Sequence, residues 1–286
     1  ITGLPFGRAF LTSSVDQSTE MPLGANLSHH YRDSASATDC ILNGLCPKDV
    51  TLDEFAGLNK PWLGYGQPGI TLLDNATYNH SQITQSAIHR VGQVAALAKP
   101  FAATEKSVIE TFNKRVKEGL VSRLAGSKGR KGDTEALKRG EASAIYTVRD
   151  FKQAYARWVT EEHVYQPRAD GRSIRERWEQ FFSDHRPTVR WSREQIKFFR
   201  MVPREIRFRE SGGLLVHQLR YGGPAVEALR RTLGATASVT VFVDPNDLTY
   251  VLVQHPHSHA LLHAACLEDP RYTVGLTLRQ QRLILS

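Results

Sequence analysis

The apolar residues of this sequence change their spacing near residue 187, and that change constrains the fold more than any other feature. Before it, one long segment has apolar residues at helical period, namely Val108, Ile109, Phe112, Val116, Leu120 and Leu124. After it, residues 239–243 and 248–253 are β-rich runs joined by a short turn, which predicts a hairpin. A chain of 286 residues with both patterns is long enough for two domains that each bury a core.

Short strands and helices alternate in the first part of the chain. The predicted elements are a hairpin over 9–15 and 21–27, a helix-compatible stretch over 35–45, a buried strand over 70–73, a helix over 81–91, a strand over 94–98 and a long helix over 104–124. A loop rich in Pro and Gly leads into the strand at 70–73, and Asp74 follows that strand directly. This order predicts an α/β domain.

Positive charge is concentrated beyond residue 100. The whole chain carries 37 Lys and Arg against 29 Asp and Glu, but its first 100 residues hold only 6 basic residues against 8 acidic ones. Residues 190–231 alone hold 10 basic residues against 4 acidic ones. This asymmetry indicates a polyanionic partner, and phosphate contacts from Lys and Arg supply most nucleic-acid affinity.

The cysteines and the N-terminal residues indicate where the protein acts. Three cysteines are too few for a disulfide framework, which favours a reducing cytosol. No apolar stretch approaches the length of a membrane span. The first residues contain neither a starting Met nor a signal peptide, so we expect the chain to begin inside a longer protein.

Asp74 and Glu110 are the strongest candidates for chemistry. Metal-dependent phosphoryl transfer needs several carboxylates that converge from different elements, and this pair lies at a strand end and on a helix. Each residue also has a simpler explanation. An acidic residue at a strand end commonly caps a turn, and Glu110 shares a helical face with Lys106 and Lys114, as in a surface ion pair.

The context of the two carboxylates resembles a known family. Residues 62–75, followed by Ser81, resemble the "G-x-P … D-N … S" motif of the integrase catalytic core in retroviral integrases and related transposases. Residues 106–112 resemble the "K-x-x-x-E-x-x-F" helix of the same core, and 35 residues separate the two acids, as in that superfamily. The resemblance implies an RNase H-like fold in which Asp74 and Glu110 are the second and third members of an Asp-Asp-Glu triad.

The second half of the chain narrows the resemblance to transposases of the phage Mu and TnsB type. Residues 213–221 and the run from Val239 to Leu248 are similar to the small β-barrel that follows the core in those enzymes. We interpret Tyr221, Asp244 and Asp247 as packing and turn residues of the barrel. The resemblance covers roughly residues 5–255.

One departure from the family pattern limits the site. The first catalytic Asp of the triad belongs on a strand upstream of residue 1, whereas Asp16 matches the Asp of a structural turn. Glu20 stands where the family usually has Arg. We therefore expect this fragment alone to lack a complete metal site and to be inactive.

The basic residues most suited to holding DNA fall into three groups. On the long helix and the following Gly-rich loop they are Lys106, Lys114, Lys117, Lys128, Arg130 and Lys131, and in the β-rich region they are Arg204, Arg207 and Arg209. Any one of them is more simply a solvated charge. A run of histidines over 255–263, with His259 and His263 at helical spacing, could bind a metal but is better explained as a solvated linker.

The sequence thus predicts an α/β RNase H-like integrase catalytic core over 1–147, truncated at its N-terminus, and a helical connector over 148–186. A small all-β barrel over 187–256 and a helical C-terminal tail over 257–286 follow. The resemblance implies a bacterial, cytoplasmic and nucleoid-associated DNA transposase that cleaves and transfers DNA strands with two Mg²⁺ or Mn²⁺ ions. It also implies transposon-end and target DNA, a homo-multimer and an AAA+ ATPase target selector as partners.

Two alternatives stay open at this point. A non-catalytic DNA-binding or assembly module derived from such a transposase would share the basic surface without the chemistry. A retroviral-type integrase or insertion-sequence transposase would keep the core and lack the barrel.

Overall fold

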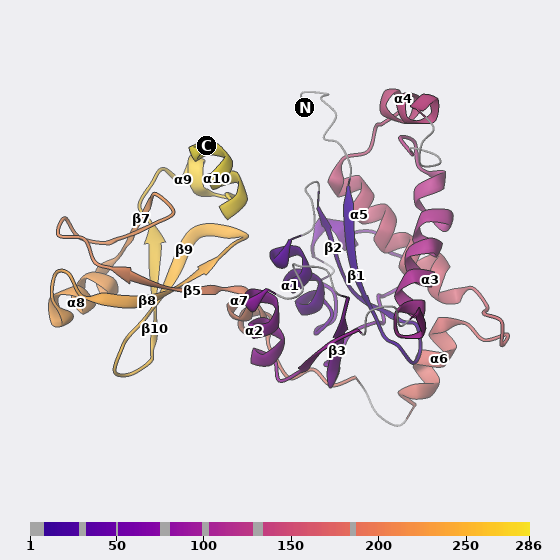
Figure 1. Ribbon diagram of the computed structural model, residues 1–286, viewed down its shortest axis with the longest axis horizontal. Helices are drawn as coiled ribbons and strands as arrows, with labels where there is room; N and C mark the ends of the chain where they lie inside the picture. Colours follow the sequence, from indigo (N-terminus) through magenta and orange to yellow (C-terminus); the bar gives the residue numbers. More distant parts are fainter. Residues whose placement is uncertain are drawn as a thin grey trace. The chain divides into compact units, whose positions relative to one another are not determined.

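The computed structural model describes residues 9–28, 33–49, 51–74, 81–98, 103–127, 134–183 and 187–286. The chain divides into two compact units, Ile1–Arg193 and Glu194–Ser286 (Figure 1). Among the described residues, no helix combines the length and the apolar character that crossing a membrane requires. The three cysteines are free thiols, as the sequence predicts.

The first unit begins with an antiparallel hairpin of β1 (Phe10–Val15) and β2 (Pro22–Ser28). In its turn, the Asp16 carboxylate accepts hydrogen bonds from the amide and the hydroxyl of Thr19, at 2.8 and 2.7 Å. The predicted hairpin and the structural role of Asp16 are therefore confirmed. Helix α1 (Ser34–Asn43) packs on β2, where a Cβ at Gly24 would lie 2.1 Å from the carbonyl oxygen of Cys40.

Strands β3 (Ile70–Leu73) and β4 (Val94–Leu97) form a parallel pair joined by α2 (Gln82–Arg90). The predicted elements are present, but the expected burial of the strand at 70–73 is wrong. Ile70 is 65% exposed and Leu72 is 39% exposed, and only Leu73 is buried. The reason is that, among the described residues, β3 has a strand partner on one side only.

Helix α3 (Ala103–Gly119) ends before residue 124, where the sequence pattern placed its end, and the 3-10 turn η3 (Val121–Arg123) follows. Its apolar stripe is buried through Phe112, Val116 and Leu120. At Gly119 a Cβ would lie 2.9 Å from the indole Nε1 of Trp158, so the helix is closely packed against that ring.

The connector consists of short helical segments: α4 (Thr134–Ala142), α5 (Val148–Arg157), the π-turn η4 (Trp158–Glu162), η5 (His163–Tyr165) and α6 (Ile174–Phe181). Reciprocal capping boxes start α5 and α6. Tyr155, Trp158 and Trp178 from these segments share one core with Met21 of the hairpin and with α3. The short turn η1 (Asp53–Phe55) packs against α5.

The second unit is built on a six-stranded antiparallel sheet. Its spatial order is β5 (Val202–Arg207), β8 (Ser238–Asp244), β9 (Asp247–Gln254), β10 (Leu261–Cys266), β7 (Leu219–Gly222) and β6 (Leu214–Val216). The two outer strands approach each other, and the Arg209 amide donates to the Gly213 carbonyl at 3.1 Å. The sheet is therefore a nearly closed barrel, as the resemblance predicts, around a core that includes Tyr221, Val241 and Leu248.

Helices accompany the barrel where none was predicted. Helix α8 (Pro224–Leu233) contributes Val226 and Leu229 to the barrel core. Helix α7 (Arg193–Arg200) also lies inside the range 187–256 that was predicted to be an all-β barrel.

The helical tail expected over 257–286 is wrong for residues 261–266, which form strand β10 between β9 and β7. Ala264 of this strand is fully buried in the barrel core, and this burial selects a strand. His259 consequently lies in a turn with φ of 56°, while His263 stacks on Tyr250, so the two are not at helical spacing. The remaining tail forms α9 (Pro270–Thr273) and α10 (Leu278–Leu285).

Candidate functional site

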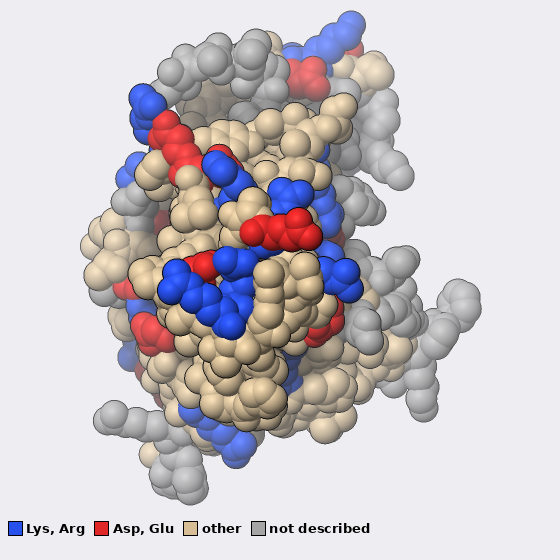
Figure 2. Space-filling model, turned by 90° about the vertical axis from the view of Figure 1, so that its left-hand side faces the viewer, with Lys and Arg blue, Asp and Glu red and all other residues tan. Residues whose placement is uncertain are grey.

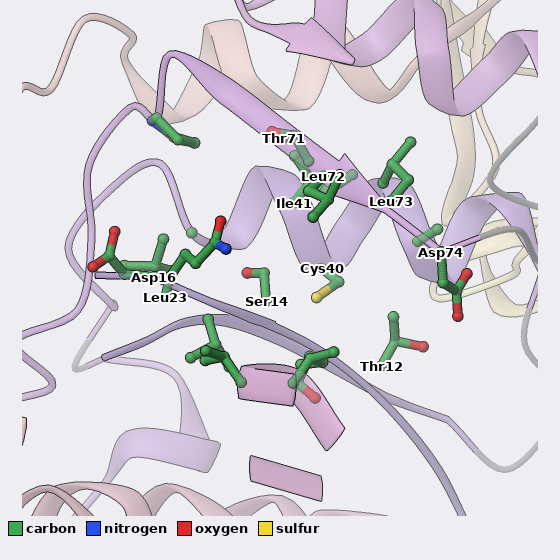
Figure 3. Close-up of a pocket in the computed structure, with 18 of the residues that line it drawn as sticks. Thr12, Ser14, Asp16, Leu23, Cys40, Ile41, Thr71, Leu72, Leu73 and Asp74 are labelled. Carbon is green, nitrogen blue, oxygen red and sulfur yellow. The ribbon is translucent and has the colours of Figure 1, made fainter. Parts of the chain in front are cut away.

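A cavity of about 310 Å³ lies in the first unit between its two pairs of strands. Strands β1 and β3 line it, together with residues of α1 and α3. The two strands run in opposite directions along the cavity: Thr12 and Asp74 lie toward one end, and Asp16 lies toward the other (Figure 3).

Neither strand has a described partner on its cavity side. β1 pairs only with β2, and β3 pairs only with β4. Because β1 and β3 are antiparallel to each other, a strand inserted parallel to β3 would be antiparallel to β1 and could pair with both. One further strand could therefore pair with both free edges, and we call the cavity between β1 and β3 the strand slot.

Asp74 stands at one end of the strand slot. It follows β3 directly, its side chain is exposed, and it is one of the residues that line the cavity. Figure 3 shows Asp74 on the same end of the slot as Thr12 of β1. A residue of an inserted strand at this end would lie beside the Asp74 carboxylate.

Glu110 is exposed on α3, the helix that borders the slot. Its neighbours Val108, Ile109 and Asn113 line the cavity, although Glu110 itself does not. The hydroxyl of Ser13 on β1 donates to Asn113 Oδ1 at 3.3 Å and ties α3 to that strand. The fold therefore brings the elements that carry both predicted acids to one cavity.

The two carboxylates supply the hard oxygen donors that Mg²⁺ and Mn²⁺ prefer. Among the described residues, no group of three His, Cys, Asp or Glu side chains could hold a metal ion. Asp74 and Glu110 thus fit part of such a site and need at least one further ligand.

The predicted basic residues have different positions. Lys114 and Lys117 are exposed on α3, while the side chain of Lys106 and all of Lys128, Arg130 and Lys131 lie outside the described residues. Arg204, Arg207 and Arg209 are exposed on β5 and just after it, in the second unit.

An ion cluster around Glu20 was missed by the sequence interpretation. This residue, at φ of 64° in the β1–β2 turn, binds Arg115 of α3 at 2.8 Å and Arg177 of α6 at 3.0 Å, with Arg168 at 3.6 Å. Burial would raise the pKa of Glu20, but the hydrogen bonds from Arg115 and Arg177 outweigh it and the pKa is lowered. The exchange of the family's usual Arg for Glu at this position was the available signal.

The contacts of Lys48 were also missed by the sequence interpretation. Its Nζ donates to the carbonyl oxygens of Leu23 and Asn43 at 2.6 Å each, and it stands 5.3 Å from the centre of the Trp62 ring. Burial lowers the pKa of Lys48 to about 7. Nothing in the local sequence indicates this burial.

Comparisons with known proteins agree with the sequence motifs. Residues 2–126 match the family model described as the TnsB C-terminal domain. No curated protein matches the chain. A solved chain from an intasome of simian T-cell lymphotropic virus, in complex with PP2A regulatory subunit B56 gamma, is 13% identical with a TM-score of 0.38; the match covers 91% of this chain and 73% of that chain.

At that TM-score the viral structure carries no weight for fold or function. The family match is different, because it spans β1 to α3 and so includes both strands of the slot and both predicted acids. The predicted resemblance to TnsB-type transposases is therefore confirmed over residues 2–126.

Proposed function

We propose that this chain contains most of an RNase H-like catalytic core, followed by the barrel, of a DNA transposase that cleaves transposon ends and joins them to target DNA. The strand slot is the observation that carries the proposal. It lies between two pairs of strands whose facing edges, β1 and β3, run in opposite directions, so that one central strand could pair with both. Asp74 stands at one end of this slot. The presence of the barrel favours this assignment over a retroviral-type or insertion-sequence enzyme without one.

The occupant of the slot, in this proposal, is a strand encoded upstream of residue 1 that carries the first catalytic Asp. Its insertion would pair the free edges of β1 and β3 and place a carboxylate near Asp74. Ile70 and Leu72, which are exposed in β3, are consistent with a sheet that is not complete among the described residues.

Asp74 and Glu110, with that upstream Asp, would hold two Mg²⁺ or Mn²⁺ ions. Bound there, the ions would activate the attacking oxygen and stabilise the charge of the leaving one. The chain's own residues would orient the reaction: Asn113 and Ser13 fix α3 against β1, and Lys114 and Lys117 offer phosphate contacts on the helix that bears Glu110.

The resemblance extends the proposal to partners. These are transposon-end and target DNA, further copies of the same protein on that DNA, and an AAA+ ATPase that selects the target. The site of action would be the bacterial cytoplasm and nucleoid.

Strand transfer by the protein with its upstream sequence tests the function. Asp74→Asn and Glu110→Gln should each lower the joining rate by about 10³-fold or more, because each removes a metal ligand worth several kcal/mol in the transition state. DNA affinity should change little. Glu118→Gln is the matched control, since it removes an exposed acid from the same helix.

Retained joining in either variant would exclude the assignment of that carboxylate to catalysis. If the upstream sequence places no Asp on the inserted strand, the protein is instead the non-catalytic DNA-binding or assembly module.

A further inference from the structure

The arginines of the second unit differ in whether they have a carboxylate partner. Five are ion-paired: Arg200 with Asp244, Arg220 with Glu268, Arg230 and Arg231 with Glu227, and Arg271 with Asp269. Figure 2 shows blue and red side chains next to one another at several places on a face that is mostly tan. An arginine that is paired with a carboxylate offers little net charge to an anion. The candidates for anion binding are therefore the arginines without such a partner among the described residues.

Two arginines that form no ion pair with any described residue lie near the β6–β7 turn. Arg204 is on β5, which runs alongside β6, and the bond from the Arg209 amide to the Gly213 carbonyl sets their antiparallel approach. Continuing that register along β5 brings Arg204 opposite the turn formed by His217 and Gln218. Arg204 and Arg282 are both exposed.

Helix α10 brings Arg282 to the same turn. The buried side chain of Gln281 donates from Nε2 to the His217 carbonyl at 3.0 Å and accepts at Oε1 from the Tyr272 hydroxyl at 2.5 Å. Arg282 is the next residue on this anchored helix. Three elements, β5, the β6–β7 turn and α10, thus bring two guanidinium groups to one imidazole.

The turn itself is strained. His217 and Gln218 have φ of 51° and 63°, a region that non-glycine residues enter at a cost of about 1–3 kcal/mol each. The Nε2 atom of His217 is enclosed and has no hydrogen-bond partner among the described residues. Burial and the charges of Arg204 and Arg282 lower the pKa of His217, which shows that both guanidinium groups lie within electrostatic reach of the ring.

Two exposed guanidinium groups near one imidazole, with no carboxylate paired to them among the described residues, form a positively charged site that is open to an anion from outside the protein. We propose that Arg204 and Arg282, spaced by His217, bind a backbone phosphate of duplex DNA on the barrel. This inference rests on the DNA function proposed above and adds a defined contact on the second unit. Guanidinium groups suit the task because each presents several N–H donors to phosphate oxygens.

The test measures binding of a fluorescent 20-base-pair duplex by the 286-residue chain over a range of salt concentrations. The double variant Arg204→Gln with Arg282→Gln should bind more weakly, and the magnitude of its slope of log affinity against log salt should fall by about 0.9, the value for one phosphate contact. The control double variant, Arg220→Gln with Arg271→Gln, removes the same charge from ion-paired arginines and should change the slope far less. Equal effects of the two double variants, or no change in the slope of the first, would overturn the site.

NMR of the His217 ring supplies a local readout. Duplex DNA should raise the pKa of His217, because a bound phosphate offsets the two arginines, and inorganic phosphate should do so only at much higher concentration. If the chain binds DNA but the pKa of His217 does not change, the proposed phosphate site is wrong, whereas the proposed DNA function is not affected. A chain without salt-dependent DNA binding contradicts the proposed DNA function as well.

Discussion

The two units differ in how the edges of their β-sheets are paired. In the second unit six antiparallel strands leave only two outer strands, and these approach each other to nearly close the barrel. In the first unit the strands form two separate pairs with a cavity between them. A free edge exposes backbone donors and acceptors that must find partners, so the unpaired edges among the described residues of the first unit are where we propose that another strand binds.

The packing that holds each unit follows from this difference. The barrel core is made mostly of aliphatic residues from its strands and from α8. The first unit relies on contacts between distant segments, such as aromatic rings of the connector against α3 and the arginines around Glu20. We therefore expect the largest effects of substitution at these long-range contacts.

Trp158→Ala should have the largest effect. The indole is 3% exposed, and its ring lies 4.5 Å from that of His163 and 6.3 Å from that of Phe112. Its removal should lower the free energy of unfolding of the first unit by about 3–5 kcal/mol. Urea denaturation followed by circular dichroism measures this, and a loss below about 1 kcal/mol would contradict the central role of the connector.

Glu20→Gln should cost about 1–2 kcal/mol, because it leaves Arg168, whose side chain is 6% exposed, without its carboxylate. Glu54→Gln breaks one partly exposed ion pair with Lys152 and should cost less than about 1 kcal/mol.

The stabilisation by Glu20 should depend on pH. Because its pKa is lowered in the folded protein, the contribution of Glu20 to the free energy of unfolding exists at neutral pH and is lost as the pH falls through that pKa. Wild type and Glu20→Gln should therefore converge in acid, and a constant difference would refute the ion cluster.

Lys48 predicts a rise of stability with pH. Its folded pKa of about 7 lies below its ordinary value of 10.5, so between these values the unfolded chain binds more protons and stability increases with pH. The slope from this group is at most about 1.4 kcal/mol per pH unit. Lys48→Met should lack that part of the rise between pH 7 and 9, and parallel curves for the two proteins would show that Lys48 stays protonated.

Tyr221→Phe probes the closed unit and should have a much smaller effect than Trp158→Ala. The hydroxyl donates to the Leu248 carbonyl at 2.9 Å inside the barrel. Loss of this one buried bond should cost about 0.5–1.5 kcal/mol. A larger loss than that of Trp158→Ala would reverse the contrast between the two units.

Local patterns predicted much of the fold. The hairpin, the β3–α2–β4 order and the stripe of Phe112, Val116 and Leu120 follow from period and turn residues. Strand β10 was missed because 261–266 is a short apolar run, and only pairing with β9 and β7 makes it a strand. The exposure of Ile70 and the burial of Lys48 depend on neighbours far away in the sequence.

The candidate site, like the fold, was predictable only where a local sequence pattern defines it. The motif spacing predicts Asp74 and Glu110, whose catalytic role stays a prediction, and the fold brings their elements to one cavity. The slot itself was not visible in the sequence, because it arises from the absence of pairing between β1 and β3 among the described residues. The contact of Gln281 with the β6–β7 turn was hidden because Gln281 and His217 are 64 residues apart.

Amide hydrogen exchange in β1 and β3 tests the central claim, that the strand slot receives an upstream strand. The measurement compares the 286-residue chain with the same chain extended by its natural upstream segment. Amides of Phe10–Val15 and Ile70–Leu73 that face the slot should exchange much more slowly in the extended chain, while barrel amides keep their rates. Equal exchange of the slot amides in both proteins would contradict the account.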